Sequence, residues 1–162
     1  MANFYGRLIH RRGDVYQGEW RADKAHGFGI LLQPDGSRYC GYWLNDLQDG
    51  RGIENWPDGS KFIGSYQQGD KNGHGEFMWS DGNHYSGEFV ANNITGQGIY
   101  SWADGRKYTG AWHENKMHGY GELEWPDGRK YAGEYHEDKK HGFGVFTWPN
   151  GSYYQGQWEN GK

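Results

Sequence analysis

Residues 108–130 read "YTGAWHENKMHGYGELEWPDGRK", and residues 131–153, "YAGEYHEDKKHGFGVFTWPNGSY", repeat the same pattern. Each segment has an aromatic-x-Gly-x-aromatic anchor, then a Gly-x-Gly pair, then Asp-Gly or Asn-Gly. A catalytic site rarely needs the same segment twice, whereas a stacked structural unit needs it many times. The duplication therefore indicates a repeat architecture.

The pattern recurs every 23 residues, with no insertion or deletion. The anchors begin at Tyr16, Tyr39, Phe62, Tyr85, Tyr108, Tyr131 and Tyr154. All 29 glycines fit the same few columns of this frame, which decides against chance similarity. We predict one array over residues 1–162, with a half repeat at 1–13, six full repeats at 14–151 and a partial repeat at 152–162.

The composition indicates a folded chain with an unusual core. A mean hydropathy of −1.12 is low, but an aromatic content of 18% is too high for a disordered chain. Aliphatic residues are too few for an ordinary core, so burial has to rely on ring against ring and ring against glycine. The net charge of −4 disfavours nucleic-acid binding.

The chain shows no stretch of about 18 apolar residues and no signal-peptide pattern at its start. Cys40 is the only cysteine, which excludes an internal disulfide and fits a reducing compartment. We therefore expect a cytoplasmic protein.

Each repeat predicts a β-hairpin. Large and polar residues alternate in the anchor and again after Gly-x-Gly, and about six residues join the two runs. The third residue of this loop is always Asp, Asn or Gly, the types that tolerate positive φ. These residues are Asp23, Asp46, Gly69, Asn92, Asn115, Asp138 and Gly161. The second connection, Trp-Pro-Asp-Gly in its fullest form, predicts a type I turn.

The remaining glycines predict a close approach of rings to backbone. Symmetrical pairing across the loop sets Tyr16 opposite Leu31, Gly18 opposite Gly29 and Trp20 opposite Gly27. The paired glycines would form a floor on which a ring of the neighbouring hairpin lies. The floor glycines are Gly18, Gly29, Gly41, Gly52, Gly64, Gly75, Gly87, Gly98, Gly110, Gly121, Gly133 and Gly144. A lone hairpin is marginal in water, so the copies must stack. The predicted fold is all-β, an elongated solenoid-like array of antiparallel β-hairpins.

The pattern Y-x-G-x-W-x-x-G/N/D-x-x-x-G-x-G followed by Asp-Gly resembles the MORN (membrane occupation and recognition nexus) repeat. The resemblance spans nearly the whole chain and is closest in "ENKMHGYG" and "EDKKHGFG". Asp49 and Thr95 depart from the histidine that the family usually has before the first Gly of the pair. The resemblance implies a protein-binding scaffold of a cytoskeletal, ciliary or membrane-associated assembly.

No motif predicts catalysis, a cofactor or a metal. "GYGELE" begins like a phosphate-binding loop, but Glu124 replaces the third glycine and no helix follows. The histidines form two columns, His26 with His118 and His141, and His113 with His136, without cysteine support for a metal. No nucleophile–base set can be named. We predict a non-enzymatic chain, although it could also be the repeat segment of a larger enzyme.

Two surfaces are candidate binding sites. The tryptophan column is Trp56, Trp79, Trp102, Trp125 and Trp148, and it would offer anchors for an extended segment or helix of a partner. The cationic column is Arg38, Lys61, His84, Lys107 and Lys130, and it would point to the other face. It could bind an acidic partner or phospholipid, which makes a peripheral phospholipid-binding module the alternative function. The simpler interpretation is a solvated face balanced by Glu19, Glu88 and Glu134.

The two ends hold complementary parts of a repeat. The first residues correspond to the second half of a copy, and "YQGQWENGK" to the first half. Unpaired strand edges invite association, so we predict self-association, with head-to-tail contacts as one form. The alternatives are a two-fold contact between like ends and the removal of natural neighbours.

Overall fold

The structure is a computed structural model that describes residues 3–162, and this part of the chain holds fourteen β-strands and no helix. The chain divides into two compact units, Met1–Ser80 (unit 1) and Asp81–Lys162 (unit 2). In both units the strands recur with the 23-residue period of the sequence. The predicted all-β repeat fold is confirmed.

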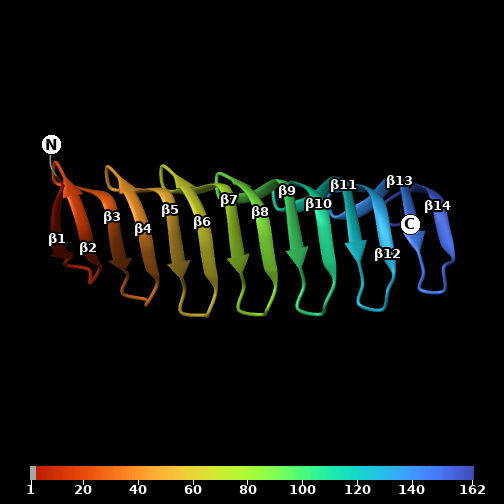
Figure 1. Ribbon diagram of the computed structural model, residues 1–162, viewed down its shortest axis with the longest axis horizontal. Coiled ribbons are helices and arrows are strands. Elements are labelled where there is room, and N and C mark those ends of the chain that lie inside the picture. The colour runs from red at the N-terminus through yellow and green to blue at the C-terminus, as the bar shows by residue number, and fades with distance from the viewer. Residues whose placement is uncertain (1–2) are drawn as a thin grey trace. The chain divides into compact units, whose positions relative to one another are not determined.

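Unit 1 is an antiparallel sheet in which strands adjacent in sequence are adjacent in space (Figure 1). Its strands are β1 Phe4–Ile9, β2 Val15–Arg21, β3 Lys24–Leu32, β4 Arg38–Leu44, β5 Leu47–Asn55, β6 Lys61–Gln67 and β7 Asp70–Met78. Within the first hairpin β2 pairs with β3, and Gly18 lies opposite Gly29. The next hairpin joins this one edge to edge, because β3 also pairs with β4, where Gly29 lies opposite Gly41.

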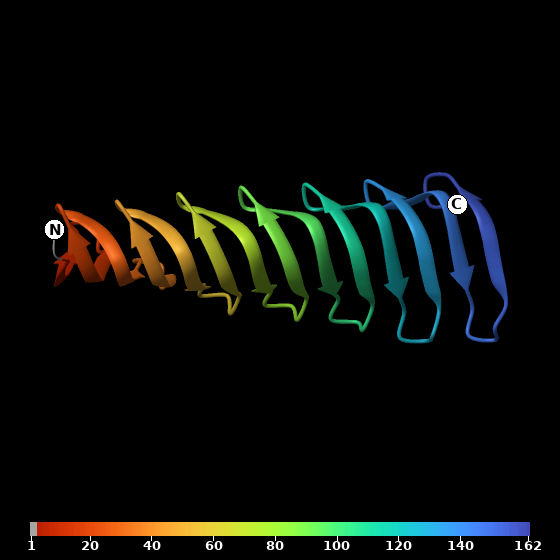
Figure 2. The ribbon, with the colours of Figure 1, turned by 45° about the horizontal axis from the view of Figure 1, so that its top comes forward.

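Unit 2 repeats the same meander, and its strands curve visibly in Figure 2. Its strands are β8 His84–Val90, β9 Asn93–Ser101, β10 Lys107–His113, β11 Lys116–Glu124, β12 Lys130–His136, β13 Lys139–Thr147 and β14 Tyr153–Trp158. Paired glycines again occupy the middle of every pair of strands, as in Gly110↔Gly121 and Gly133↔Gly144.

The predicted six-residue hairpin loop is wrong, because only two residues lie between the strands. β2 ends at Arg21 and β3 begins at Lys24, with Ala22 at φ 50° and Asp23 at φ 62°. Two successive positive φ values match the twist of a tight hairpin. The predicted left-handed column is confirmed at all seven positions: Asp23, Asp46, Gly69, Asn92, Asn115, Asp138 and Gly161.

The shorter turn also changes the predicted pairing. Tyr16↔Leu31 and Gly18↔Gly29 are confirmed, but Trp20 faces Ala25 and not Gly27. The register shifts between Gly18 and Trp20, where a bulge of β3 opposes Glu19. The bulge explains the first glycine of each Gly-x-Gly pair, since Gly27 lies at φ 90°.

The second connection is the predicted turn. In unit 1 the N–H of Gly59 donates to the carbonyl of Trp56 at 3.1 Å, and in unit 2 that of Gly128 donates to Trp125 at 3.0 Å. The aspartate inside the turn accepts the N–H of the residue two positions later, as Asp58 does from Ser60 at 2.8 Å.

The core is a row of interlocked rings on one face of each sheet, which we call the aromatic face. The ring on the glycine floor belongs to the same repeat, and the predicted neighbouring hairpin does not supply it. A Cβ added to Gly121 would meet the ring of Tyr108, whose hydroxyl donates to the carbonyl of Ala111 at 2.8 Å. Tyrosine fits because its ring crosses the bare backbone and its hydroxyl satisfies a carbonyl beyond it.

The neighbouring repeat contributes the closing aromatic. The indole of Trp112 donates to the carbonyl of Gly98 at 3.2 Å and meets Tyr85 and Tyr108 edge-on, at 5.8 and 5.1 Å between ring centroids. In unit 1 Trp43 makes the equivalent bond to Gly29 at 3.1 Å, between Tyr16 and Tyr39. Within each unit, these rings therefore clamp one repeat to the repeat before it.

Candidate functional site

The tryptophan column lies on the aromatic face, at the end of the second strand of each hairpin. Cross-strand pairing places Phe146 beside Tyr131, and Trp148 lies two residues further on the same face. Trp56, Trp79, Trp102 and Trp125 are half-buried, and Trp148 is 41% exposed. The column is therefore only partly used by the core, and the role predicted for it stays a proposal.

The inner sides of these indoles pack on rings of the same or the following repeat. In unit 1 Trp56 stacks on Phe77 at 5.4 Å, and Trp79 lies 4.5 Å from Phe77. In unit 2 Trp125 and Trp148 flank Phe146 at 5.5 and 4.7 Å. Such contacts hold each indole in place and leave only part of each ring exposed.

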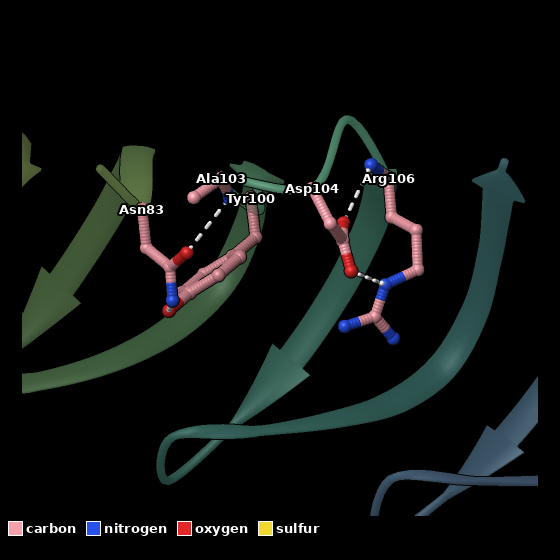
Figure 3. A network of polar contacts seen from close by, with 5 residues as sticks. All are labelled: Asn83, Tyr100, Ala103, Asp104 and Arg106. Atoms are coloured by element: carbon pink, nitrogen blue, oxygen red, sulfur yellow. Dashed lines mark hydrogen bonds and ion pairs between the residues drawn. The ribbon is translucent and has the colours of Figure 1, made fainter. Parts of the chain in front are cut away.

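Arginines of the following turn lie over two of the indoles in unit 2. The guanidinium carbon of Arg106 is 4.7 Å from the Trp102 ring, and that of Arg129 is 5.1 Å from Trp125. Asp104 holds Arg106 in place, since it accepts the Nε–H at 2.8 Å (Figure 3). In the same turn the backbone N–H of Ala103 donates to the side-chain oxygen of Asn83 at 2.9 Å. Trp148 has Ser152 at the position of these arginines and is the more exposed.

Two lysines that sequence analysis did not single out lie among the rings. Lys140 Nζ is 5.5 Å from the ring centroids of Trp125, Tyr131 and Trp158 and 5.7 Å from that of Phe146. Burial, and then the charge of Arg129, hold its pKa below the usual value. In the sequence these lysines belong to one column of the repeat, the second residue after the left-handed turn position. Its members are Ala25, Gln48, Lys71, Ile94, Met117 and Lys140.

Lys71 lies in the equivalent place in unit 1. Its Nζ is 5.4 Å from the Trp56 ring, 5.2 Å from Phe62 and 4.0 Å from a carboxylate oxygen of Glu54. Glu54 also accepts the hydroxyl of Tyr66 at 2.6 Å. The aromatic face therefore accommodates ammonium groups between its rings.

The cationic column lies on the opposite face, which we call the second face, as predicted by strand alternation. Lys107 and Lys130 flank Glu124 across the sheet of unit 2, and Lys130 Nζ is 3.8 Å from its carboxylate. Arg38 pairs with Leu32 and Asn55, and Lys61 with Asn55 and Met78, in unit 1. His84 pairs with Ser101 in unit 2.

Glu19, Glu88 and Glu134, the residues expected to balance this face, are engaged by the backbone. Their carboxylates accept the backbone N–H groups of Phe28, Gln97 and Phe143 in the bulges. The structure thus gives these glutamates a local backbone function.

Histidine rings of unit 2 lie in a row beside the two-residue turns that join β10 to β11 and β12 to β13. His118 lies 4.8 Å from His136, and His113 and His141 extend the row. Within residues 3–162 no group of three His, Cys, Asp or Glu side chains could hold a metal ion. The same part of the chain holds no helix that is long and apolar enough to cross a membrane.

A family model described as the MORN repeat matches seven successive segments of the chain. They are residues 16–38, 39–61, 62–84, 85–105, 108–128, 131–153 and 154–162. These boundaries follow the anchors read from the sequence, so the resemblance is confirmed. No curated protein matches the chain.

Solved structures are similar to this chain at low sequence identity, and one of them has a TM-score above 0.5. The TCP domain of Drosophila melanogaster SAS-4 (dCPAP), in complex with a proline-rich motif of Ana2 (dSTIL), is 9% identical over 95% of this chain and 90% of its own, with a TM-score of 0.53. The TCP10 domain of Danio rerio CPAP with a STIL peptide is 16% identical over 95% and 84%, with a TM-score of 0.33.

Proposed function

Because the chain belongs to the MORN repeat family, we propose that it is a non-catalytic scaffold that binds an extended segment of another protein along its aromatic face. The partially exposed tryptophan column carries this proposal. Trp102, Trp125 and Trp148 recur at one repeat spacing in unit 2, and each is fixed on its inner side by a ring. Regularly spaced, immobilised indoles provide large apolar contact at low entropic cost.

An extended, proline-rich segment suits this surface better than a globular partner. Such segments are ordered before binding and dock on aromatic-lined grooves. The SAS-4 domain, whose fold this chain shares, was solved with a proline-rich motif. We further propose that the partner belongs to a cytoskeletal assembly, located in a cilium or at the membrane cortex.

Affinity capture from the native source tests the proposal. The bait carries Trp102→Ala, Trp125→Ala and Trp148→Ala, and the matched control carries Tyr120→Ala and Phe143→Ala. The control residues are aromatic, belong to the second face of unit 2, and are 59% and 48% exposed. Proteins retained by the wild type should be lost from the tryptophan variant and kept by the control. The reverse pattern would place binding on the second face.

Peptide arrays of the captured partner then define the segment. A linear segment that binds alone supports the proposal, whereas binding that requires a helix or a folded domain contradicts it. Anionic vesicles provide a separate arm for the phospholipid alternative. Co-sedimentation that is lost on changing Arg38, Lys61, Lys107 and Lys130 to Glu would favour that alternative.

A further inference from the structure

A hollow of about 540 Å³ opens on the aromatic face of unit 1 beside Ala25. Tyr16, Trp20, Leu31 and Trp43 provide its apolar and aromatic wall. Its volume lies within the range of about 300–1,000 Å³ typical of small-molecule sites. Ala25 is the smallest residue in its column, so this repeat leaves open the space that longer side chains occupy in other repeats.

Unit 2 shows what fills the same space five repeats later. Lys140 stands at the position of Ala25, and its ammonium lies among four rings whose counterparts in unit 1 all line the hollow, three of them as rings and one as Leu31. Tyr131 corresponds to Tyr16, Phe146 to Leu31, Trp158 to Trp43 and Trp125 to His10, all of which line the hollow. At this point of its repeat, the ammonium group of Lys140 thus lies 5.5–5.7 Å from four ring centroids.

A second internal example adds a carboxylate. Lys71 also stands at the position of Ala25, between Trp56 and Phe62, with Glu54 at 4.0 Å. Its side chain is only 17% exposed. Two independent copies therefore show an alkylammonium held between rings at this point of the repeat.

The electrostatics of the hollow favour a cation. Asp14, Asp23 and Asp46 line it, against the single guanidinium of Arg12, which is 3.7 Å from Asp14. One oxygen of Asp46 accepts the N–H of Ala25 at 2.7 Å, which fixes the carboxylate at the rim. Burial, and then the charges of Glu19 and Asp46, raise the pKa of Tyr16 to about 12. The site is therefore negative as well as aromatic.

We propose that the hollow beside Ala25 binds the ammonium group of a lysine side chain from the partner segment. The inference rests on the proposed function, because the lysine would belong to the proposed partner segment. The ammonium group would be bound as those of Lys71 and Lys140 are bound in their repeats. The lysine stem would lie against Leu31 and Trp43 while its charge faces the rings and carboxylates. The hollow would fix the register of the bound segment.

The first test uses Nα-acetyl-lysine N-methylamide as a probe and the indole N–H signals of Trp20 and Trp43 in NMR spectra as the readout. Saturable shifts of these signals are expected. The norleucine analogue, which has a similar chain but no charge, should bind several-fold more weakly. Equal binding of both probes, or no saturable shift with lysine, would overturn the proposal.

Variants of the hollow make the test specific. Ala25→Lys should place an ammonium of the protein itself in the site, as Lys71 and Lys140 do, and abolish probe binding without loss of stability. Ala25→Met fills the hollow without charge, as Met117 does in its repeat, and should also block the probe. Persistence of the Trp20 and Trp43 shifts in both variants would contradict the assignment.

The converse variant is Lys140→Ala, which should create a second site and add shifts of Trp125 and Trp158. Failure to bind the probe there, in a variant whose thermal unfolding remains cooperative, would also contradict the proposal. Partner capture distinguishes failure of the lysine site from failure of the proposed function. Partner binding that survives Ala25→Lys and Ala25→Met refutes only the lysine site, whereas binding that survives the tryptophan variant refutes the proposed function.

Discussion

The second faces of the two units differ, although their aromatic faces are built alike. In unit 1 four consecutive members of one cross-strand row are apolar and half-buried, namely Ile30, Cys40, Ile53 and Ile63, and polar residues flank them: Arg7 and Gln17 on one side, Glu76 on the other. The equivalent row in unit 2 is largely polar or small. It runs through Ser86, Ile99, Thr109, Glu122, Ala132, Val145 and Gln155.

The difference shows which parts of the repeat the fold constrains. Tyr85, Tyr108 and Tyr131 are fully buried in unit 2, as Phe62 is in unit 1, and all lie on their glycine floors. The second face, in contrast, accepts Ile53, Glu122 or Val145 at one column position. One face therefore holds the fold, while the other varies from repeat to repeat.

Alkaline pH should produce the largest effect and affect both units. Burial raises the pKa of Tyr16 and Tyr131 to about 12, and that of Tyr39, Tyr85 and Tyr108 further. An unfolded tyrosine ionises near pH 10, so above that pH the unfolded state releases protons that the folded state keeps. Stability should be complete below pH 10 and fall as pH rises through 12. Phenolate absorbance and circular dichroism should change together, and ionisation of the rings in a still folded protein would contradict this packing.

Overpacking of the glycine floor should destabilise both units equally. A Cβ at Gly87 would lie 2.5 Å from Gly98 Cα and 2.6 Å from the carbonyl of Gln97, and one at Gly64 lies 2.6 Å from Gly75 Cα. Gly87→Val and Gly64→Val should each cost about 1–3 kcal/mol in urea unfolding.

The matched control is Gly156→Val. The three atoms nearest to a Cβ there all belong to the ring and hydroxyl of Tyr154, which is 43% exposed, and no backbone atom is among them. Its loss should be much smaller. Equal losses at Gly64, Gly87 and Gly156 would mean that these glycines serve the backbone conformation and not the close approach of a ring.

Removal of the tyrosine hydroxyl should have an intermediate effect. Tyr39→Phe and Tyr85→Phe delete the hydrogen bonds to the carbonyls of Tyr42 and Glu88, at 2.8 and 2.9 Å. Phe62 already stands in this column, so the ring itself is tolerated. A loss of about 0.5–1.5 kcal/mol is expected for each, measured by urea unfolding. The more exposed Tyr154→Phe should change less, and a larger loss there would contradict the argument.

Second-face exchanges should have the smallest effect on stability. Ile53→Thr in unit 1 and Thr109→Ile in unit 2 are expected to stay within about 0.5 kcal/mol of the wild type. Binding of a hydrophobic dye should fall for the first and rise for the second. A loss for Ile53→Thr as large as that for Gly64→Val would remove the distinction between the two faces.

Much of the fold follows from the sequence, because a strict period and the residue types of turns are local signals. Asp23 and its equivalents predicted the left-handed turn position, and the Trp-Pro-Asp-Gly segments predicted the second turn. The bulge opposite Glu19 was missed, since Ala22 is not a residue type that suggests positive φ and symmetrical pairing was assumed.

Contacts between repeats were harder to predict from the sequence. Because every repeat has the same pattern, the sequence does not show whether the ring on a glycine floor comes from the same repeat or from its neighbour. The sequence therefore could not assign Tyr108 to its own glycine floor or Trp112 to the preceding one. It also gave no reason to place Lys71 and Lys140 among rings, since lysine ordinarily indicates a solvated position. The tryptophan column was placed correctly on the aromatic face, and its binding role is the part that experiment must decide.

The most direct measurement is an NMR titration of the indole N–H signals with the segment mapped from the captured partner. Trp112 and Trp158 donate their indole N–H groups to carbonyls inside the array, so their signals serve as an internal reference. We predict that the signals of Trp102, Trp125 and Trp148 shift on binding, and that those of Trp112 and Trp158 change least. Backbone amide signals recorded in the same titration provide the opposite outcome: shifts confined to second-face residues such as Tyr120 and Phe143, with the tryptophan column unchanged, would contradict the account.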